Sequence, residues 1–110
     1  MEITISELET ICMELISYTG EGRGLVHEAI EAFAAGDLDT CQQKAAKADE
    51  MLVQAHNIQF TRLLKPQAQG AVIPYHLLLL HAMDLLMVST SELDVLKKMI
   101  SGSLSRKAVE

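Results

Sequence analysis

The stretch Leu77–Val88, which reads LLLLHAMDLLMV, decides how this 110-residue chain can fold. The four leucines at 77–80 cover every direction around a helix axis, and the apolar run at 85–88 does so again about two turns later. A helix that is apolar on all sides is buried on all sides. Because a three-helix bundle of one chain covers only part of each helix, the remaining face needs another subunit. The stretch therefore predicts an oligomer with this helix at its seam.

The flanking residues set the expected ends of this helix. Pro74 suits the first turn of a helix, where its missing N–H needs no partner. The run Ser101-Gly102-Ser103 is typical of a helix end. We therefore predict a helix over residues 74–100, and we expect the last residues, 106–110, to fray.

A long first helix is predicted from a heptad pattern. Apolar side chains occupy a and d positions from Ile5 to Phe33 in one register. The register passes without a slip through residues 20–24, although three glycines there each cost a helix about 1 kcal/mol relative to alanine. An unbroken register on both sides of the glycines predicts one helix over residues 4–35.

A second helix follows after a short turn. Gly36 supplies the left-handed residue that ends helices, and Asp37 is a typical N-cap. A second heptad series decays near Pro66, because the residue before a proline is pushed out of the α region. This predicts a helix over residues 38–64 and a connector over 66–74. The chain is thus expected to be all-α, an antiparallel three-helix bundle that forms a single domain over residues 1–110.

The composition excludes several classes of partner. With 15 acidic and 9 basic side chains the net charge is −6, so we expect no nucleic acid, whose phosphates such a surface repels. The longest apolar run is far too short for direct membrane insertion. The first residues lack the basic region of a secretory signal, and Cys12 and Cys41 lack metal-binding or CxxC spacing. Reduced thiols and a cytoplasmic location are therefore expected.

His81 and Asp84 are the candidate site residues, since their spacing of three places them on one face of the helix. A lone histidine on a buried helix is most often a hydrogen-bonded core residue. A carboxylate among leucines and methionines, however, costs several kcal/mol unless it is paired or metal-bound. If the helix lines a threefold axis, the Asp84 carboxylates converge, and oxygen-only ligation suits Mg²⁺. His81 would then lie near a subunit cleft, where a neutral imidazole nitrogen could attack phosphorus.

Four stretches carry a resemblance to a known family: PYHLLLLHAMDLLM at 74–87, YTGEGR at 18–23, Gly36-Asp37, and AHNIQ at 55–59. In order and spacing they resemble the lactose/cellobiose-type IIA components of the bacterial sugar phosphotransferase system (PTS). That family shows a His-(Gly/Ala)-Gln-Asp-His-Leu-Met signature on its active-site helix. Its other patterns are Tyr-Ala-Gly-Asp-Ala-Arg in the first helix and Ala-His-x-x-Gln in the second. The resemblance spans the chain from about Ile5 to Ile100.

The resemblance implies a fold, an activity and partners. It implies an antiparallel three-helix bundle assembled as a homotrimer. His81, in the position of the signature histidine, would accept a phosphoryl group from the histidine-containing carrier HPr and pass it to the cysteine of a IIB component during uptake of a lactose/cellobiose-type sugar. Asp84, in the position of the signature aspartate, would bind one Mg²⁺ per trimer on the threefold axis.

Two signature positions differ from the family. Met83 stands in place of the glutamine, and a thioether cannot offer the amide hydrogen bond that a phosphoryl oxygen would accept. Leu85 stands in place of the second histidine. These differences keep a second hypothesis open, in which the bundle is a non-catalytic helical interaction or regulatory module.

Two other histidines are possible supporting residues. His56 matches a family position that is not the phosphoryl acceptor, and we expect it to make a hydrogen bond either on its own helix face or between helices. His76 lies five residues before His81, and the sequence leaves open whether it is on the surface or in a cleft.

We expect the protein to be a trimer in solution, because the helix at 74–100 is apolar on all sides. Static light scattering should give a mass about three times that of the 12.1 kDa chain. A mass near that of the single chain at micromolar concentration would rule the trimer out.

Overall fold

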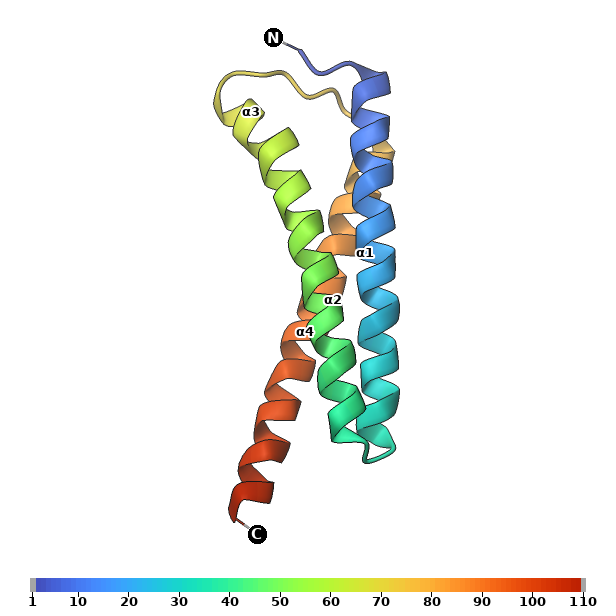
Figure 1. Cartoon of the computed structure of the whole chain (residues 1–110). Helices are drawn as coiled ribbons and strands as arrows, with labels where there is room; N and C mark the ends of the chain where they lie inside the picture. Colours follow the sequence, from blue (N-terminus) through green and yellow to red (C-terminus); the bar gives the residue numbers. More distant parts are fainter. Residues whose placement is uncertain (1, 110) are drawn as a thin grey trace.

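The computed structural model describes residues 2–109, which form three long helices joined by short connections. The long helices are α1 (Ile5–Ala34), α2 (Leu38–Gln59) and α4 (Leu77–Val109), and α2 continues into a π-helical turn, η1 (Phe60–Leu64), and the short α3 (Lys65–Ala68). In Figure 1, α1 and α4 run in one direction and α2 runs in the other. The predicted all-α, antiparallel three-helix bundle is confirmed. The only β-type pairing among residues 2–109 is one isolated bridge between Glu2 and Val72.

The core is a narrow seam along the length of the bundle, which measures 59 × 22 × 17 Å. Its buried side chains repeat at helical spacing, and many on α2 are alanines, which allow close approach of the helices. They are Leu8, Ile11, Cys12, Leu15, Val26 and Ala29 of α1, Cys41, Ala45, Ala48, Leu52 and Ala55 of α2, Leu63 of η1, and Ala82, Leu86, Leu93, Leu96 and Ile100 of α4. No helix among residues 2–109 has the length and apolar character needed to cross a membrane.

Both cysteines belong to this core and carry free thiols. Burial raises the pKa of the Cys12 thiol, and the nearby Glu9 carboxylate raises it further. Burial likewise raises the pKa of Cys41, with a smaller contribution from Asp37. Because the thiolate is the reactive form, both side chains act as small apolar core residues.

The helix α1 is continuous through its glycine-rich middle, in agreement with the predicted helix over residues 4–35. It begins with a capping box, in which the Thr4 hydroxyl accepts from the Glu7 N–H and the Glu7 carboxylate accepts from the Thr4 N–H. Gly22 is buried at the contact with α2, where an added Cβ would lie 2.9 Å from Leu52 Cδ2. The glycine therefore lets α1 and α2 approach closely.

The turn between α1 and α2 also agrees with the prediction. Gly36 has a positive φ of 78°, which a glycine adopts without strain. The Asp37 side chain accepts from the Thr40 N–H and caps α2. This hydrogen bonding lowers the pKa of Asp37, because it stabilises the charged form.

The second helix does not end before Pro66, so the predicted boundary at residue 64 and the connector over 66–74 are wrong. Lys65 keeps α-helical angles, and its N–H donates to the Phe60 carbonyl across the wider π turn. An α-helical ladder would place the Pro66 ring against the carbonyl four residues earlier. The π turn changes the spacing of these hydrogen bonds, so Pro66 falls in the first turn of α3. An N–H at that position would have no partner within the helix, so the proline costs no hydrogen bond. The true connector begins at Gly70, which has a φ of 99°.

The third long helix differs from the predicted 74–100 at both ends. Residues 74–76 are not helical, and the His76 Nδ1 atom accepts from the Leu78 N–H at 3.1 Å, which satisfies one of the first free donors of α4. The helix then continues through Gly102 to Val109, so residues 106–109 are helical and not frayed. One glycine costs only about 1 kcal/mol, and the basic Arg106 and Lys107 in the last turn complement the helix dipole.

The glycines of α1 allow a matched test of packing. We expect Gly20→Ala and Gly24→Ala each to raise the free energy of unfolding by about 0.5–1 kcal/mol, the difference in helix propensity, since an added Cβ meets nothing within 4 Å. Gly22→Ala should lose this gain or destabilise, because its Cβ would press on Leu52. Urea denaturation at one protein concentration measures all three. An equal gain at Gly22 would show that the α1–α2 contact is not close.

Candidate functional site

The outer face of α4 is a stripe of exposed apolar side chains. Leu77 and Met87 are each 70% exposed, and Leu80 and Val88 are about half exposed. The opposite face of the same helix packs on α1 and α2 through residues such as Ala82, and it is fully buried. One chain therefore covers only one side of α4. We call the residues Leu77, Leu80, His81, Asp84, Met87 and Val88 the outer stripe.

His81 and Asp84 lie within the outer stripe and are both exposed. Their spacing of three residues places them one turn apart on this face. Among residues 2–109 neither side chain has a hydrogen-bond or ion-pair partner. In the single chain the Asp84 carboxylate is therefore solvated, and the cost of a carboxylate among apolar groups arises only when another subunit covers the stripe.

Asp84 fits a metal ion only in combination with other copies of the chain. A Mg²⁺ ion takes several oxygen ligands. Among residues 2–109 of one chain, no three His, Cys, Asp or Glu side chains come close enough together to hold a metal ion. Asp84 points outward from the bundle, so equivalent carboxylates would meet only if several α4 helices packed around a common axis.

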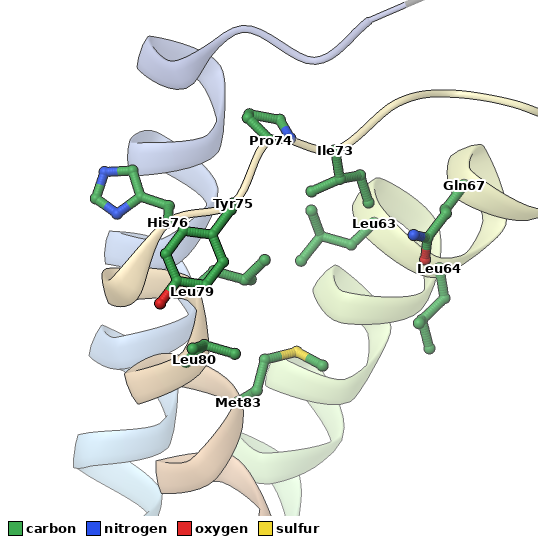
Figure 2. Close-up of a pocket in the computed structure, with 10 residues that line it drawn as sticks. All are labelled: Leu63, Leu64, Gln67, Ile73, Pro74, Tyr75, His76, Leu79, Leu80 and Met83. Carbon is green, nitrogen blue, oxygen red and sulfur yellow. The ribbon is translucent and has the colours of Figure 1, made fainter.

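A second feature is an apolar cavity of about 310 Å³ at the end of the bundle where α4 begins. The residues drawn in Figure 2 come from η1, α3, the connector and the first turns of α4. They include Leu63, Tyr75, His76, Leu79 and Met83. Met83 therefore faces α2, and its sulfur accepts a hydrogen bond of 3.0 Å from the Gln59 amide. Within one chain, an amide at position 83 would meet Gln59 and not His81.

His76 links the connector to α1. Its Nδ1 atom accepts from the Leu78 N–H, so the ring proton is on Nε2. Nε2 lies 3.8 Å from the Glu9 carboxylate. The ring thus anchors the start of α4, and its polar contacts do not reach His81.

Of the two hydrogen bonds expected for His56, on its own helix face or between helices, the structure has the one between helices. The Thr90 hydroxyl donates to the Leu86 carbonyl at 2.8 Å, so it can only accept from the ring. The His56 Nε2–H therefore donates to the Thr90 oxygen, at 3.1 Å. This bond joins α2 to α4 more than two turns beyond His81, and the ring is not part of the outer stripe.

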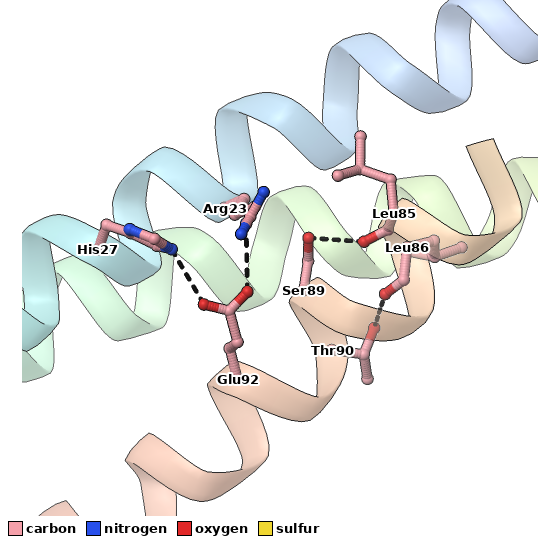
Figure 3. Close-up of polar contacts among 7 residues, drawn as sticks. All are labelled: Arg23, His27, Leu85, Leu86, Ser89, Thr90 and Glu92. Atoms are coloured by element: carbon pink, nitrogen blue, oxygen red, sulfur yellow. Dashed lines mark hydrogen bonds and ion pairs between the residues drawn. The ribbon is translucent and has the colours of Figure 1, made fainter. Parts of the chain in front are cut away.

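A polar cluster that the sequence did not reveal joins α1 to α4 (Figure 3). The Glu92 carboxylate accepts from the Arg23 Nε at 3.1 Å through one oxygen and lies 2.9 Å from the His27 Nε2 through the other. Next to it is an open cavity of about 470 Å³ lined by Gly20, Arg23, Gly24, His27 and Leu85. Glu92 lies more than sixty residues from both basic partners, so no sequence spacing could have paired them.

Comparison with known proteins identifies the class of this chain. The family model described as "PTS system, Lactose/Cellobiose specific IIA subunit" matches residues 10–103. The chain therefore belongs to the lactose/cellobiose-specific IIA family of the sugar phosphotransferase system. The resemblance carried by the four sequence stretches is thus confirmed.

Individual relatives agree with this assignment. The chain is similar to the PTS system lactose-specific EIIA component of Streptococcus mutans, with 35% identity over 94 residues, 86% of this chain and 89% of that protein. It is also similar to the oligo-beta-mannoside-specific EIIA component of Bacillus subtilis, with 32% identity over 100 residues, 91% and 90% of the two chains.

Solved structures share the fold. PtcA from S. mutans superposes with a TM-score of 0.85 at 32% identity, over 89% of this chain and 95% of that one. The cellobiose-specific enzyme IIA from Bacillus anthracis superposes with a TM-score of 0.82 at 28% identity, over 96% and 94% of the two chains.

Proposed function

We propose that this protein is a phosphocarrier that accepts a phosphoryl group on His81 from HPr and passes it to a IIB component. The observation that carries the proposal is the exposure of His81, which stands at the signature position of a IIA family member, on a rigid helix. Transfer between proteins requires an acceptor that a second protein can reach. An imidazole held on a helix whose other side is packed in the core meets this need.

The chemistry needs no redox partner. The bond between phosphorus and the donor imidazole of HPr breaks as a new N–P bond forms at a ring nitrogen of His81. The ring proton of His81 is released to solvent or to the donor imidazole. In the second transfer the N–P bond of His81 breaks, and the phosphoryl group joins the thiolate of the IIB cysteine. With an ordinary pKa near 6.5, a free imidazole is mostly neutral and nucleophilic at pH 7.

The proposed active form is a homotrimer in which the apolar residues of three outer stripes and Asp84 pack around a threefold axis, while His81 lies near a cleft between subunits, where a second protein can still reach it. This would cover Leu77, Leu80, Met87 and Val88, which one chain leaves exposed. It would also bring the Asp84 carboxylates together, where they would hold a divalent cation, which we propose to be Mg²⁺. Such an ion would neutralise charges that otherwise oppose association. With HPr and a IIB component as its partners, the protein would act in the cytoplasm.

The proposed role is in uptake of a lactose/cellobiose-type sugar. The relatives differ in the sugar named for them, which includes lactose, cellobiose and oligo-beta-mannosides. A carrier that contacts only other proteins has no sugar-binding pocket from which the sugar could be inferred. We therefore propose the class of sugar and not the individual sugar.

The alternative is a non-catalytic helical module that binds or regulates a partner. The observations that favour it are Met83 and Leu85, which depart from the signature. The Met83 sulfur accepts a hydrogen bond from Gln59 of α2, and the side chain does not face the outer stripe. The departure at position 83 is therefore weak support for the helical module.

We expect His81→Ala to lose all acid-labile label when the protein is incubated with enzyme I, HPr and labelled phosphoenolpyruvate. A phosphoramidate is labile in acid and stable in base, which distinguishes it from a phosphoserine. His56→Ala and His76→Ala are the matched controls and should retain the label, because the polar contacts of these rings go to Thr90 and Glu9. Label on His81→Ala would show that the site is wrong. An unlabelled wild type in the presence of active HPr would favour the helical module.

We expect Asp84→Leu to keep the trimer or strengthen it while abolishing binding of Mg²⁺. Replacement of a buried charge cluster by apolar groups is often neutral or stabilising, by about 1–4 kcal/mol. Sedimentation equilibrium measures the assembly and isothermal calorimetry the cation. Dissociation of Asp84→Leu into monomers would mean that the carboxylate makes a stabilising pair across the interface instead.

A further inference from the structure

His76 is the last residue before α4 and stands in the N-cap position of that helix. Its ring Nδ1 accepts from the Leu78 N–H at 3.1 Å, and its carbonyl accepts from the Leu79 N–H, also at 3.1 Å. The same carbonyl accepts from the Leu80 N–H at 3.4 Å. The first N–H groups of a helix lack partners inside the helix. His76 alone therefore supplies the acceptors for three N–H groups of the first turn.

The other edge of the ring faces α1. The His76 Nε2 atom lies 3.8 Å from a carboxylate oxygen of Glu9, and the His76 side chain is 28% exposed. Figure 2 shows the ring on the side of α1, where α4 begins. The residue that caps α4 is thus also held against the neighbouring helix.

Packing alone holds the first turn of α4 only weakly. None of residues 77–81 is fully buried, and the first fully buried residue of α4 is Ala82. Leu78 and Leu79 pack on the core with part of their surface only. Residues 73–76, which precede the turn, have no helical hydrogen bonding of their own. The bonds to His76 are therefore a main restraint that keeps this turn helical.

His81 depends on this turn through the backbone. In an α-helix each N–H donates to the carbonyl four residues earlier, so the His81 N–H pairs with Leu77, the first residue of α4. If the first turn unwinds, His81 loses this bond and becomes part of a frayed helix end. The direction of its imidazole would then vary, and a misplacement of about 1 Å can slow a reaction on the order of a hundredfold.

We infer that His76 is a positioning residue for phosphoryl transfer, because it caps α4 and thereby holds the His81 imidazole in a constant direction. The inference rests on the proposed function, since it concerns the same reaction. His76 acts through the helix backbone and does not contact the phosphoryl group. His76→Ala still contains the acceptor imidazole, so it retains the label at the end of the reaction, and the effect falls on the rate.

The test measures the initial rate of transfer from phosphorylated HPr by rapid quenching. We expect His76→Ala to lower the rate about threefold to tenfold, the range that corresponds to loss of one helix cap. His76→Asn should come within about twofold of wild type, because an asparagine side chain at the N-cap accepts from the same early N–H groups. Hydrogen exchange of the amides of residues 78–81 should be faster in His76→Ala and restored in His76→Asn.

Asp37→Ala is the matched control, because it also removes a helix cap, the 3.1 Å bond from the Thr40 N–H to Asp37 at the start of α2. This site lies at the other end of the bundle (Figure 1), so transfer should proceed at the wild-type rate. Thermal unfolding measures the stability that each variant loses.

The outcomes separate this inference from the proposed function. If His76→Ala transfers as fast as wild type, or if Asp37→Ala is slowed equally, the positioning role is overturned while the phosphocarrier stands. If His76→Asn is as slow as His76→Ala, the cap is not the cause and the inference also fails. An unlabelled wild type in the presence of active HPr would overturn the proposed function itself.

Discussion

The excess of apolar surface on α4 is the constraint on which the rest of the structure depends. Two neighbouring helices can cover only one side of a third, and here α1 and α2 bury the side that carries Ala82, Leu86 and Leu93. The side with Leu77 and Met87 stays open to solvent. Removing apolar surface from water is worth about 25 cal/mol per Å², so covering this side of α4 would be favourable.

The polar side chains of α4 fall into two groups, those that bond to the other helices and those that face solvent. Side chains at its flanks tie it to the bundle: Thr90 binds His56 of α2, and Glu92 binds Arg23 of α1. His81 and Asp84, on the outer stripe, have no such ties within residues 2–109. The flanking bonds fix the rotation of α4 about its axis. Without that fixed rotation, the outer stripe would not present its histidine and carboxylate in a constant direction.

Two boundaries differed from the sequence prediction for one physical reason. A proline or a glycine alters local backbone preference by about 1–3 kcal/mol, and tertiary or neighbouring structure can absorb that amount. A π turn before Pro66 relieved the clash that would have ended α2. Continued helical hydrogen bonding carried α4 past Gly102 to Val109. By contrast, α4 begins at Leu77, later than the predicted residue 74. The His76 ring accepts from the Leu78 N–H and so caps the helix at this point.

The sequence by itself determined the helical fold, the number of long helices and the family. Hydrophobic period and helix caps are local properties, so they were sufficient for α1 and for the turn at Gly36, and the motif spacing placed His81 and Asp84 on one face. Only the tertiary structure decided which cation meets which carboxylate and that Met83 turns toward Gln59. Arg23 and Glu92 are 69 residues apart, and their contact depends on how α1 packs beside α4. The rotation of α4 beside α1 is set by how whole faces of the two helices pack, and no single stretch of sequence specifies that packing.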